Sequence, residues 1–299
     1  MTPRTSSRPP KNLFFETMRI VALPFIALPP LLMAQDSATV QLARAENEFA
    51  RSAAEIGIKR AFLGHFGDSA IIFIPHAANA KQVFASEPEN GDRLVWHPSF
   101  VEASSSADFG YTTGPSEYMP SGAGEGKARS AHFLSVWKKD GDGEWKVILD
   151  VGSRCPSVNM EGESLQVSKR EIEEEMPATT PANRVELLLK ADSLYSRAID
   201  VEGSSEALTR FGSERVIVYR QGRYPARDRK NGVLQLAPEK FDGHTRNAFG
   251  VAASADLGFT HGLATTGGAD TSTYVRIWRW ENEWRVAVDL VNPWPKAGN

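Results

Sequence analysis

The chain has 299 residues, of which 41% are hydrophobic and 24% charged, and its formal net charge is −3. This composition is that of a soluble globular protein, excludes disordered and fibrous classes, and leaves length for two ordinary domains. No cluster of Lys and Arg is interleaved with aromatic residues, so we expect no nucleic-acid partner. Cys155 is the only cysteine, which excludes an internal disulfide.

The N-terminus has the pattern of an export signal. Basic residues precede an apolar run, Ile20–Ala34, which changes abruptly to polar residues at Gln35. The run contains three prolines and is too short for a membrane span, which needs roughly 20 residues. We expect residues 1–34 to be a signal peptide cleaved after Ala34, which predicts a periplasmic or secreted protein with no stable membrane span after signal removal. Translation from Met18 and an uncleaved anchor are the alternatives.

The residues after the signal predict a helical start to the first domain. Apolar residues recur at spacings of three and four, which predicts one amphipathic helix; they are Leu42, Ala45, Phe49, Ala53 and Ile56. Residues 59–66 predict a second, shorter helix, residues 69–75 a strand, and residues 79–86 a further short helix.

A meander of four strands is expected next. Its first strand covers residues 93–103, and Pro98 within it indicates an edge position or a bulge, because proline donates no ladder hydrogen bond. Three apolar runs follow, at residues 108–114, 131–137 and 144–150. Asp140–Gly143 between the last two is a strong hairpin signal, since Asp-Gly pairs tolerate the positive φ of such turns.

The second half of the chain repeats this order. Three segments match the three apolar runs of the first half: Ser254–Gly262, Thr273–Trp278 and Glu283–Asp289. They are preceded by a predicted helix with a capping box at Asn183 and Glu186, a second helix at 205–211, and a strand at 215–220. We interpret the protein as two copies of one domain, at residues 38–155 and 183–295.

Residues 156–182 separate the two copies. Apolar periodicity disappears here, and Ser168–Glu175 is highly charged. This pattern predicts an exposed linker, with at most one helical turn.

Several repeated motifs carry a resemblance to a known superfamily. Each copy has paired helices and a strand, then Asp-Phe/Leu-Gly-Tyr/Phe-Thr-x-Gly, then aromatic-x-x-x-Trp, then Trp-Lys/Arg-Val before an Asp. Trp96–Pro98 adds to the resemblance in the first copy. The chain resembles the nuclear transport factor 2-like superfamily, and most closely the bacterial domains related to ketosteroid isomerase and polyketide cyclases.

This resemblance implies an α+β fold of two tandem cone-shaped domains, each a curved antiparallel sheet wrapped around N-terminal helices with a pocket at its open end. The superfamily includes isomerases, dehydratases, cyclases and pure binding or dimerisation modules, so the fold gives no chemistry. Its members often pair through the outer face of the sheet. We therefore expect an intramolecular pseudo-dimer or a homodimer through that face.

One pair of titratable residues is a candidate catalytic site. If the hairpin sets Trp137 opposite Trp145, antiparallel pairing brings His132 close to Asp150. A carboxylate beside an imidazole can act as an acid/base pair, or it can only steady the end of the hairpin. In the second copy the same alignment sets Thr273 opposite Asp289, so the dyad would be absent there.

The candidate ligand-binding residues are Trp96, His97, Tyr111 and Phe133. We expect no metal, because the histidines show no metal-ligand spacing such as HExxH. We also expect no cofactor, because the glycines form no phosphate-cradling loop that opens a helix.

Two hypotheses of function follow. The favoured one is an exported tandem module whose cone pockets bind a small, largely apolar ligand or a protein partner without catalysis. The alternative is a cofactor-independent isomerase or lyase, in which His132 and Asp150 of the first domain transfer a proton while Tyr111 or Trp96 orients the substrate.

Overall fold

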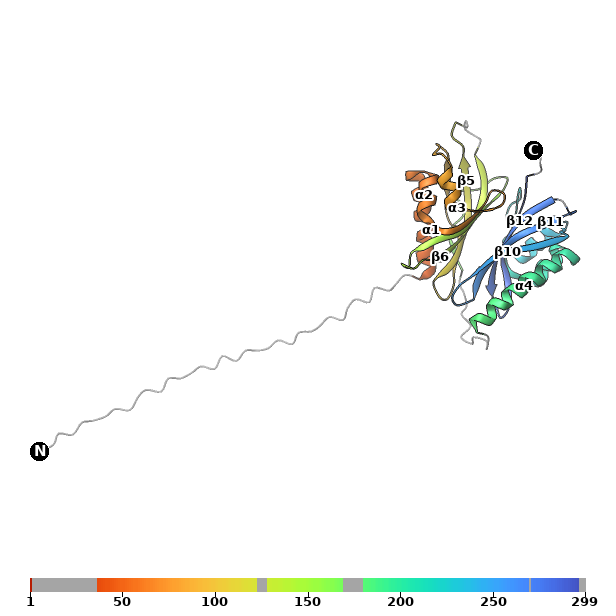
Figure 1. The fold of residues 1–299 in the computed structure, drawn as a ribbon. Coiled ribbons are helices and arrows are strands. Elements are labelled where there is room, and N and C mark those ends of the chain that lie inside the picture. The colour runs from red at the N-terminus through yellow and green to blue at the C-terminus, as the bar shows by residue number, and fades with distance from the viewer. Residues whose placement is uncertain (2–36, 123–127, 169–179, 269, 296–299) are drawn as a thin grey trace. The chain divides into compact units, whose positions relative to one another are not determined.

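The computed structural model describes Met1 and residues 37–122, 128–168, 180–268 and 270–295. All described residues from Ser37 onward belong to one compact unit. We name the part within 37–168 the first lobe and the part within 180–295 the second lobe (Figure 1). Apart from Met1, the predicted signal peptide lies outside the described residues. None of the helices in the described ranges is long and apolar enough to cross a membrane.

Three helices belong to the first lobe: α1 (Ala38–Ile56), α2 (Ile58–His65) and α3 (Ala80–Ser86). The hydroxyl of Ser37 and the side chain of Asn79 accept backbone N–H groups and so cap α1 and α3. Gly57, with φ of 88°, separates α1 from α2, which lets the two helices follow one another at an angle.

The first sheet contains eight strands: β1 (Phe66–Phe73), β2 (Ala77–Asn79), β3 (Arg93–Trp96), β4 (Phe100–Ala103), β5 (Phe109–Met119), β6 (Arg129–Lys139), β7 (Trp145–Arg154) and β8 (Gln166–Val167). Their order is β2-β1-β7-β6-β5-β4-β8, and β3 also pairs with β5. The pairs β1–β7 and β4–β8 are parallel, and the others are antiparallel. The predicted strand at 93–103 is divided at Pro98 into β3 and β4, which agrees with the missing proline donor.

The segment predicted as an exposed linker is not entirely a linker. Strand β8 lies within it and pairs in parallel with β4, where Gln166 is opposite Phe100 and Val167 opposite Val101. The prediction is wrong here because two residues are too few to produce a periodic pattern, while the free edge of β4 supplies the hydrogen bonds. The charged run from residue 169 to 179 lies outside the described residues.

The second lobe contains α4 (Pro181–Glu202), α5 (Ser204–Phe211), α6 (Arg229–Leu236), β9 (Gly212–Arg220), β10 (Gly243–Val251), β11 (Leu257–Thr266), β12 (Asp270–Trp280) and β13 (Trp284–Pro293). The sheet order is β10-β11-β12-β13-β9, with β9 parallel to β13. The predicted capping box at Asn183 is wrong, because the Thr180 side chain accepts the N–H of Asn183 and the helix begins earlier. The α+β class is confirmed, while descent from one duplicated domain stays a prediction.

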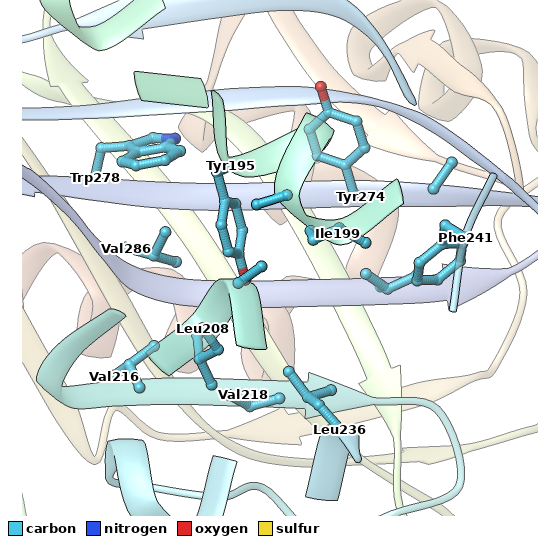
Figure 2. Close-up of a cluster of buried hydrophobic side chains, with 14 of the residues drawn as sticks. Tyr195, Ile199, Leu208, Val216, Val218, Leu236, Phe241, Tyr274, Trp278 and Val286 are labelled. Atoms are coloured by element: carbon cyan, nitrogen blue, oxygen red, sulfur yellow. The ribbon is translucent and has the colours of Figure 1, made fainter. Parts of the chain in front are cut away.

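Each lobe has a core between its helices and the inner face of its sheet. In the first lobe this core includes Leu42, Phe49, Phe62 and Trp137. Figure 2 shows the corresponding cluster of the second lobe, in which Tyr195 from α4 lies near Tyr274 and Trp278 from β12. Burial of such aromatic side chains stabilises each lobe.

A third apolar cluster joins the two sheets. It includes Phe109, Leu134 and Val136 of the first lobe with Phe259 and Ile277 of the second. The two sheets therefore pack against each other within the chain.

Polar contacts accompany this apolar cluster. The buried carboxylate of Glu102 accepts from Nε and Nη2 of Arg279 at 2.7 and 2.5 Å. Ser106 and Ser254 exchange hydrogen bonds, because the backbone N–H of each donates to the hydroxyl of the other, at 3.3 and 3.1 Å. Each of these two turns therefore both donates to and accepts from the other.

Candidate functional site

The first lobe contains a cavity of about 710 Å³ between its helices and the inner face of its sheet. Six aromatic side chains form much of its wall: Phe49, Phe62, Phe84, Trp96, Tyr118 and Phe133. At the mouth, three basic residues (Lys59, Arg60, Arg129) lie among three acidic ones (Glu87, Glu89, Asp92). The wall is therefore mostly apolar, and the mouth has no excess of either charge.

The strand period explains which residues reach the cavity. Ala131 and Phe133 on β6, and Asp150 and Gly152 on β7, are spaced by two and so lie on the same face of the sheet. Phe49 reaches the same space from α1, and its ring lies 4.9 Å from that of Trp96 in an edge-to-face contact.

Asp150 places one carboxyl group against this apolar space. The hydroxyl of Ser135, directly opposite on β6, donates to Oδ2 of Asp150 at 2.7 Å. Burial raises the pKa of Asp150 to about 6, although the hydrogen bond from Ser135 opposes this shift. A carboxyl group with this pKa is ionised at neutral pH and gains or loses a proton under mild conditions.

A second acid, Glu46 of α1, lies deeper in the lobe and has no exposed surface. Its carboxyl accepts from Nε1 of Trp96 at 2.6 Å, Nε1 of Trp137 at 2.9 Å and the hydroxyl of Thr112 at 2.5 Å. Burial raises the pKa of Glu46 to about 7 against these hydrogen bonds, and the charge of Asp150 adds to the increase. The two acids are thus electrostatically linked.

Sequence reasoning missed Glu46. The signal was available: Glu46 follows Leu42 by four residues and precedes Phe49 by three, so it lies on the buried face. Asp192 has the same spacing between Leu188 and Tyr195 in α4. A charged residue inside an apolar stripe indicates a buried polar site.

In the second lobe, Asp192 and Asp289 take the positions of Glu46 and Asp150, and an arginine lies between them. Arg276 is opposite Asp289 on neighbouring strands, just as Ser135 is opposite Asp150. Nη1 of Arg276 donates to Oδ1 of Asp192 at 2.9 Å, and its Nε lies 3.8 Å from Oδ1 of Asp289. The side chain is completely buried, so it fills the interior where the first lobe has only a serine hydroxyl.

Further cations complete this network. Nη2 of Arg220 donates to Oδ2 of Asp289 at 2.9 Å, and Nη1 of Arg246 donates to Oδ2 of Asp192 at 3.0 Å. Burial alone would raise the pKa of Asp289, but the charges of Arg220 and Arg276 outweigh it and hold that pKa below its usual value. The acids of the second lobe are therefore neutralised by the chain itself.

The predicted pairing of His132 with Asp150 is wrong. The hairpin sets Lys139, not Trp137, opposite Trp145, and a bulge between Val136 and Trp137 shifts the register again. His132 is consequently opposite Ser153, which lies three residues after Asp150 on β7. Because side chains alternate along a strand, this odd number places His132 and Asp150 on opposite faces of the sheet. The acid/base dyad does not form.

His132 instead belongs to a polar cluster near the contact between the lobes. Its Nε2 lies 3.4 Å from Oε1 of Glu163, whose other oxygen accepts from Nη2 of Arg227 at 2.6 Å. The hydrogen bond from His132 and the charge of Arg227 lower the pKa of Glu163 to about 2. His97 joins this cluster, with Nε2 3.2 Å from the carbonyl oxygen of Glu163.

The four candidate ligand-binding residues divide into two groups. Trp96 and Phe133 line the cavity. Tyr111 lies in the apolar cluster between the sheets, where its hydroxyl donates to Glu102 at 3.0 Å, and His97 lies in the Glu163 cluster. The faces of β5 could not be assigned from the pattern alone, because most of that strand is buried on both sides.

No protein-family model matches the chain, and a search of curated proteins finds no relative. Solved structures do match. A putative ketosteroid isomerase from Parabacteroides distasonis is 15% identical, with a TM-score of 0.29, and covers 38% of this chain and 84% of its own. An NTF-2-like protein of unknown function from Shewanella oneidensis is 11% identical, with a TM-score of 0.31, and covers 38% and 98%.

The CaMKII hub of S. rosetta is 17% identical, with a TM-score of 0.32, and covers 40% of this chain and 98% of its own. The chain is thus similar, over about 38% of its length, to NTF-2-like and ketosteroid isomerase-like structures, the superfamily that its motifs resemble.

Proposed function

We propose that the first lobe binds a small, largely apolar molecule in its cavity and that the second lobe is its structural partner. The observation that carries this proposal is the cavity of about 710 Å³ with six aromatic side chains in its wall. Ligand pockets are typically about 300–1,000 Å³, mostly apolar, with a few placed polar groups. Asp150 supplies such a group, whereas the equivalent space of the second lobe contains Arg276.

The test is a titration with Nile red, a neutral apolar dye whose fluorescence increases in apolar surroundings. Gly152 lines the cavity, and a Cβ added there meets nothing closer than 4.0 Å, so Gly152→Phe fills the space from a tolerant position. Gly141, in the exposed hairpin turn, also has open space around an added Cβ, which makes Gly141→Phe the matched control.

Wild type and Gly141→Phe are expected to bind the dye with equal affinity. Gly152→Phe is expected to weaken binding at least about tenfold, because 1.4 kcal/mol of lost contact corresponds to that factor. Equal binding by all three proteins would show that the dye, and hence an apolar ligand, does not use this cavity.

Proton transfer by the first lobe is a second candidate function, favoured by the pKa of Asp150 of about 6. A general base works best when its pKa lies near the working pH. Because His132 faces away, a cofactor-independent isomerase or lyase would use Asp150 alone at the cavity wall. Its test is the isomerisation of β,γ-unsaturated ketones, followed by the ultraviolet absorbance of the conjugated product. Turnover by the wild type should disappear in Asp150→Asn and persist in His132→Ala. If the wild type shows no turnover, binding without catalysis is the function that stands.

Export and the tandem organisation belong to the same proposal. The basic, apolar and polar succession of the N-terminus supports export to the periplasm or medium. The similar element orders of the two lobes support two domains at residues 38–155 and 183–295, of which the first is extended by β8.

A further inference from the structure

The interior of the second lobe surrounds an organic cation, the guanidinium of the protein's own Arg276, with aromatic rings and carboxylates. The guanidinium carbon lies 4.6 Å from the ring centroid of Tyr195 and 4.1 Å from that of Tyr274. Nη1 donates to Asp192 at 2.9 Å and to the hydroxyl of Ser196 at 2.8 Å. Two aromatic faces and a carboxylate are the groups that recognise a buried cation.

The first lobe has the same walls. Phe49 follows the helix acid Glu46 by three residues, as Tyr195 follows Asp192. Phe133 precedes Ser135 by two residues on the middle strand, as Tyr274 precedes Arg276. Both phenylalanines line the cavity, so the aromatic pair is present and faces open space.

The first lobe also has the acids but lacks the cation. The hydrogen bonds that described residues make to Asp150 and Glu46 come from neutral donors, namely the hydroxyls of Ser135 and Thr112 and the indoles of Trp96 and Trp137. A buried carboxylate without a countercharge is unfavourable, and an incoming positive charge relieves that cost.

The basic residues that line the cavity contact groups other than Asp150. Arg60 is paired with Glu89 at 2.7 Å, and the Lys59 ammonium donates to the carbonyl oxygens of Ala85 and Glu87. The guanidinium of Arg129 lies 5.8 Å from the ring centroid of Tyr118 at the mouth. The mouth carries equal numbers of acids and bases, so the uncompensated charge lies at the inner wall.

We infer that the ligand of the first-lobe cavity is an organic cation, an amine or guanidinium on a largely apolar body. Its charged nitrogen lies beside Asp150, in the place that the Arg276 guanidinium takes in the second lobe, and its body packs against Phe49 and Phe133. This inference rests on the proposed function and specifies the chemical class of its ligand.

The probes are 4-phenylbutylamine and the neutral 4-phenylbutanol, which have the same apolar body and are titrated at pH 8 by calorimetry. At this pH Asp150 is ionised and the amine is protonated. The wild type is expected to bind the amine at least about tenfold more tightly than the alcohol, which corresponds to about 1.4 kcal/mol. Asp150→Asn is expected to lose this preference.

A second variant imitates the other lobe. In Ser135→Arg the new guanidinium takes the place of the ligand's cation, so binding of the amine should be lost. If Ser135→Arg fails to fold, the amine-over-alcohol preference of Asp150→Asn still tests the inference, because asparagine has the size of aspartate.

An amine that binds no more tightly than the alcohol, or an unchanged preference in Asp150→Asn, would overturn the inference. Nile red binding by the same preparation then tests the proposed function separately from the cation inference. If the dye still binds in the cavity, only the cation inference is wrong. If the dye does not bind there, the proposed function is wrong as well.

Discussion

Ser135 and Arg276 occupy matching positions on the middle strands of the two sheets, each opposite an aspartate on the next strand. The serine hydroxyl donates to Asp150 and leaves the space in front of it open, whereas the arginine reaches both Asp192 and Asp289 and fills the corresponding space. One side chain thus distinguishes the open space in front of Asp150 from the internal ionic core of the second lobe.

Replacing Arg276 should destabilise the protein strongly. Arg276→Ala leaves the buried carboxylates of Asp192 and Asp289 with less compensation, and breaking a buried ion pair costs about 3–5 kcal/mol. Urea denaturation measures the change in the free energy of unfolding. Arg215→Ala, at an exposed position on β9, is the matched control and should change that energy by no more than about 0.5 kcal/mol. Similar losses in both variants would contradict a supporting role for Arg276.

The ionisation of Asp150 should make stability depend on pH. Folding raises its pKa from 3.8 to about 6, so the folded state binds the proton more tightly than the unfolded state does. The resulting stabilisation is fully present below pH 3.8 and is lost as the pH rises through 6, by at most about 3 kcal/mol.

Asp150→Asn removes this titration. The difference in the free energy of unfolding, variant minus wild type, should therefore increase between pH 4 and pH 7, as measured by urea denaturation at several pH values. A difference that stays constant over this range would mean that the carboxyl group has its ordinary pKa.

Glu102 and Arg279 should be coupled across the contact between the lobes. Both side chains are largely buried and hydrogen-bonded to each other, so either alanine variant removes an opposite charge from beside a largely buried one. A double-mutant cycle with Glu102→Ala and Arg279→Ala should give a coupling energy of about 2 kcal/mol or more. Additive single effects would show that the pair adds nothing to lobe packing.

Export should be visible in the mass of the protein. Cleavage after Ala34 is expected because the apolar run ends there in a small residue before a polar segment. Intact-mass spectrometry of protein from the cell envelope or medium should give a chain that begins at Gln35. A mass that includes Met1 or Met18 would contradict the predicted signal cleavage.

The element order was predictable because it depends on local patterns. Spacings of three and four in α1, the proline break at Pro98 and the Asp-Gly turn at residues 140–143 each have a short-range physical cause. The aromatic wall of the site was partly predictable for the same reason, since Trp96 and Phe133 lie in recognisable strands.

The strand register was not predictable. At the bulge opposite Val136 and Trp137, β7 contains one extra residue, Ile148, and this single residue changes which side chains of β7 share a sheet face with His132. The role of Arg276 also depends on tertiary packing. Asp192 of α4 and Asp289 of β13 are far apart in the sequence, and only the folded lobe brings both beside the Arg276 guanidinium.

We propose that ligand binds in the first lobe and not in the second, and the indole N–H signals of the tryptophans distinguish the two lobes. Trp96 lines the cavity, whereas Trp278 is buried in the second lobe and donates to Thr260 at 2.9 Å. In ¹H–¹⁵N spectra recorded during titration with 4-phenylbutylamine, assigned with Trp96→Phe and Trp278→Phe, the Trp96 signal should shift and saturate while the Trp278 signal stays in place. A saturable shift of Trp278 with no change at Trp96 would contradict the account.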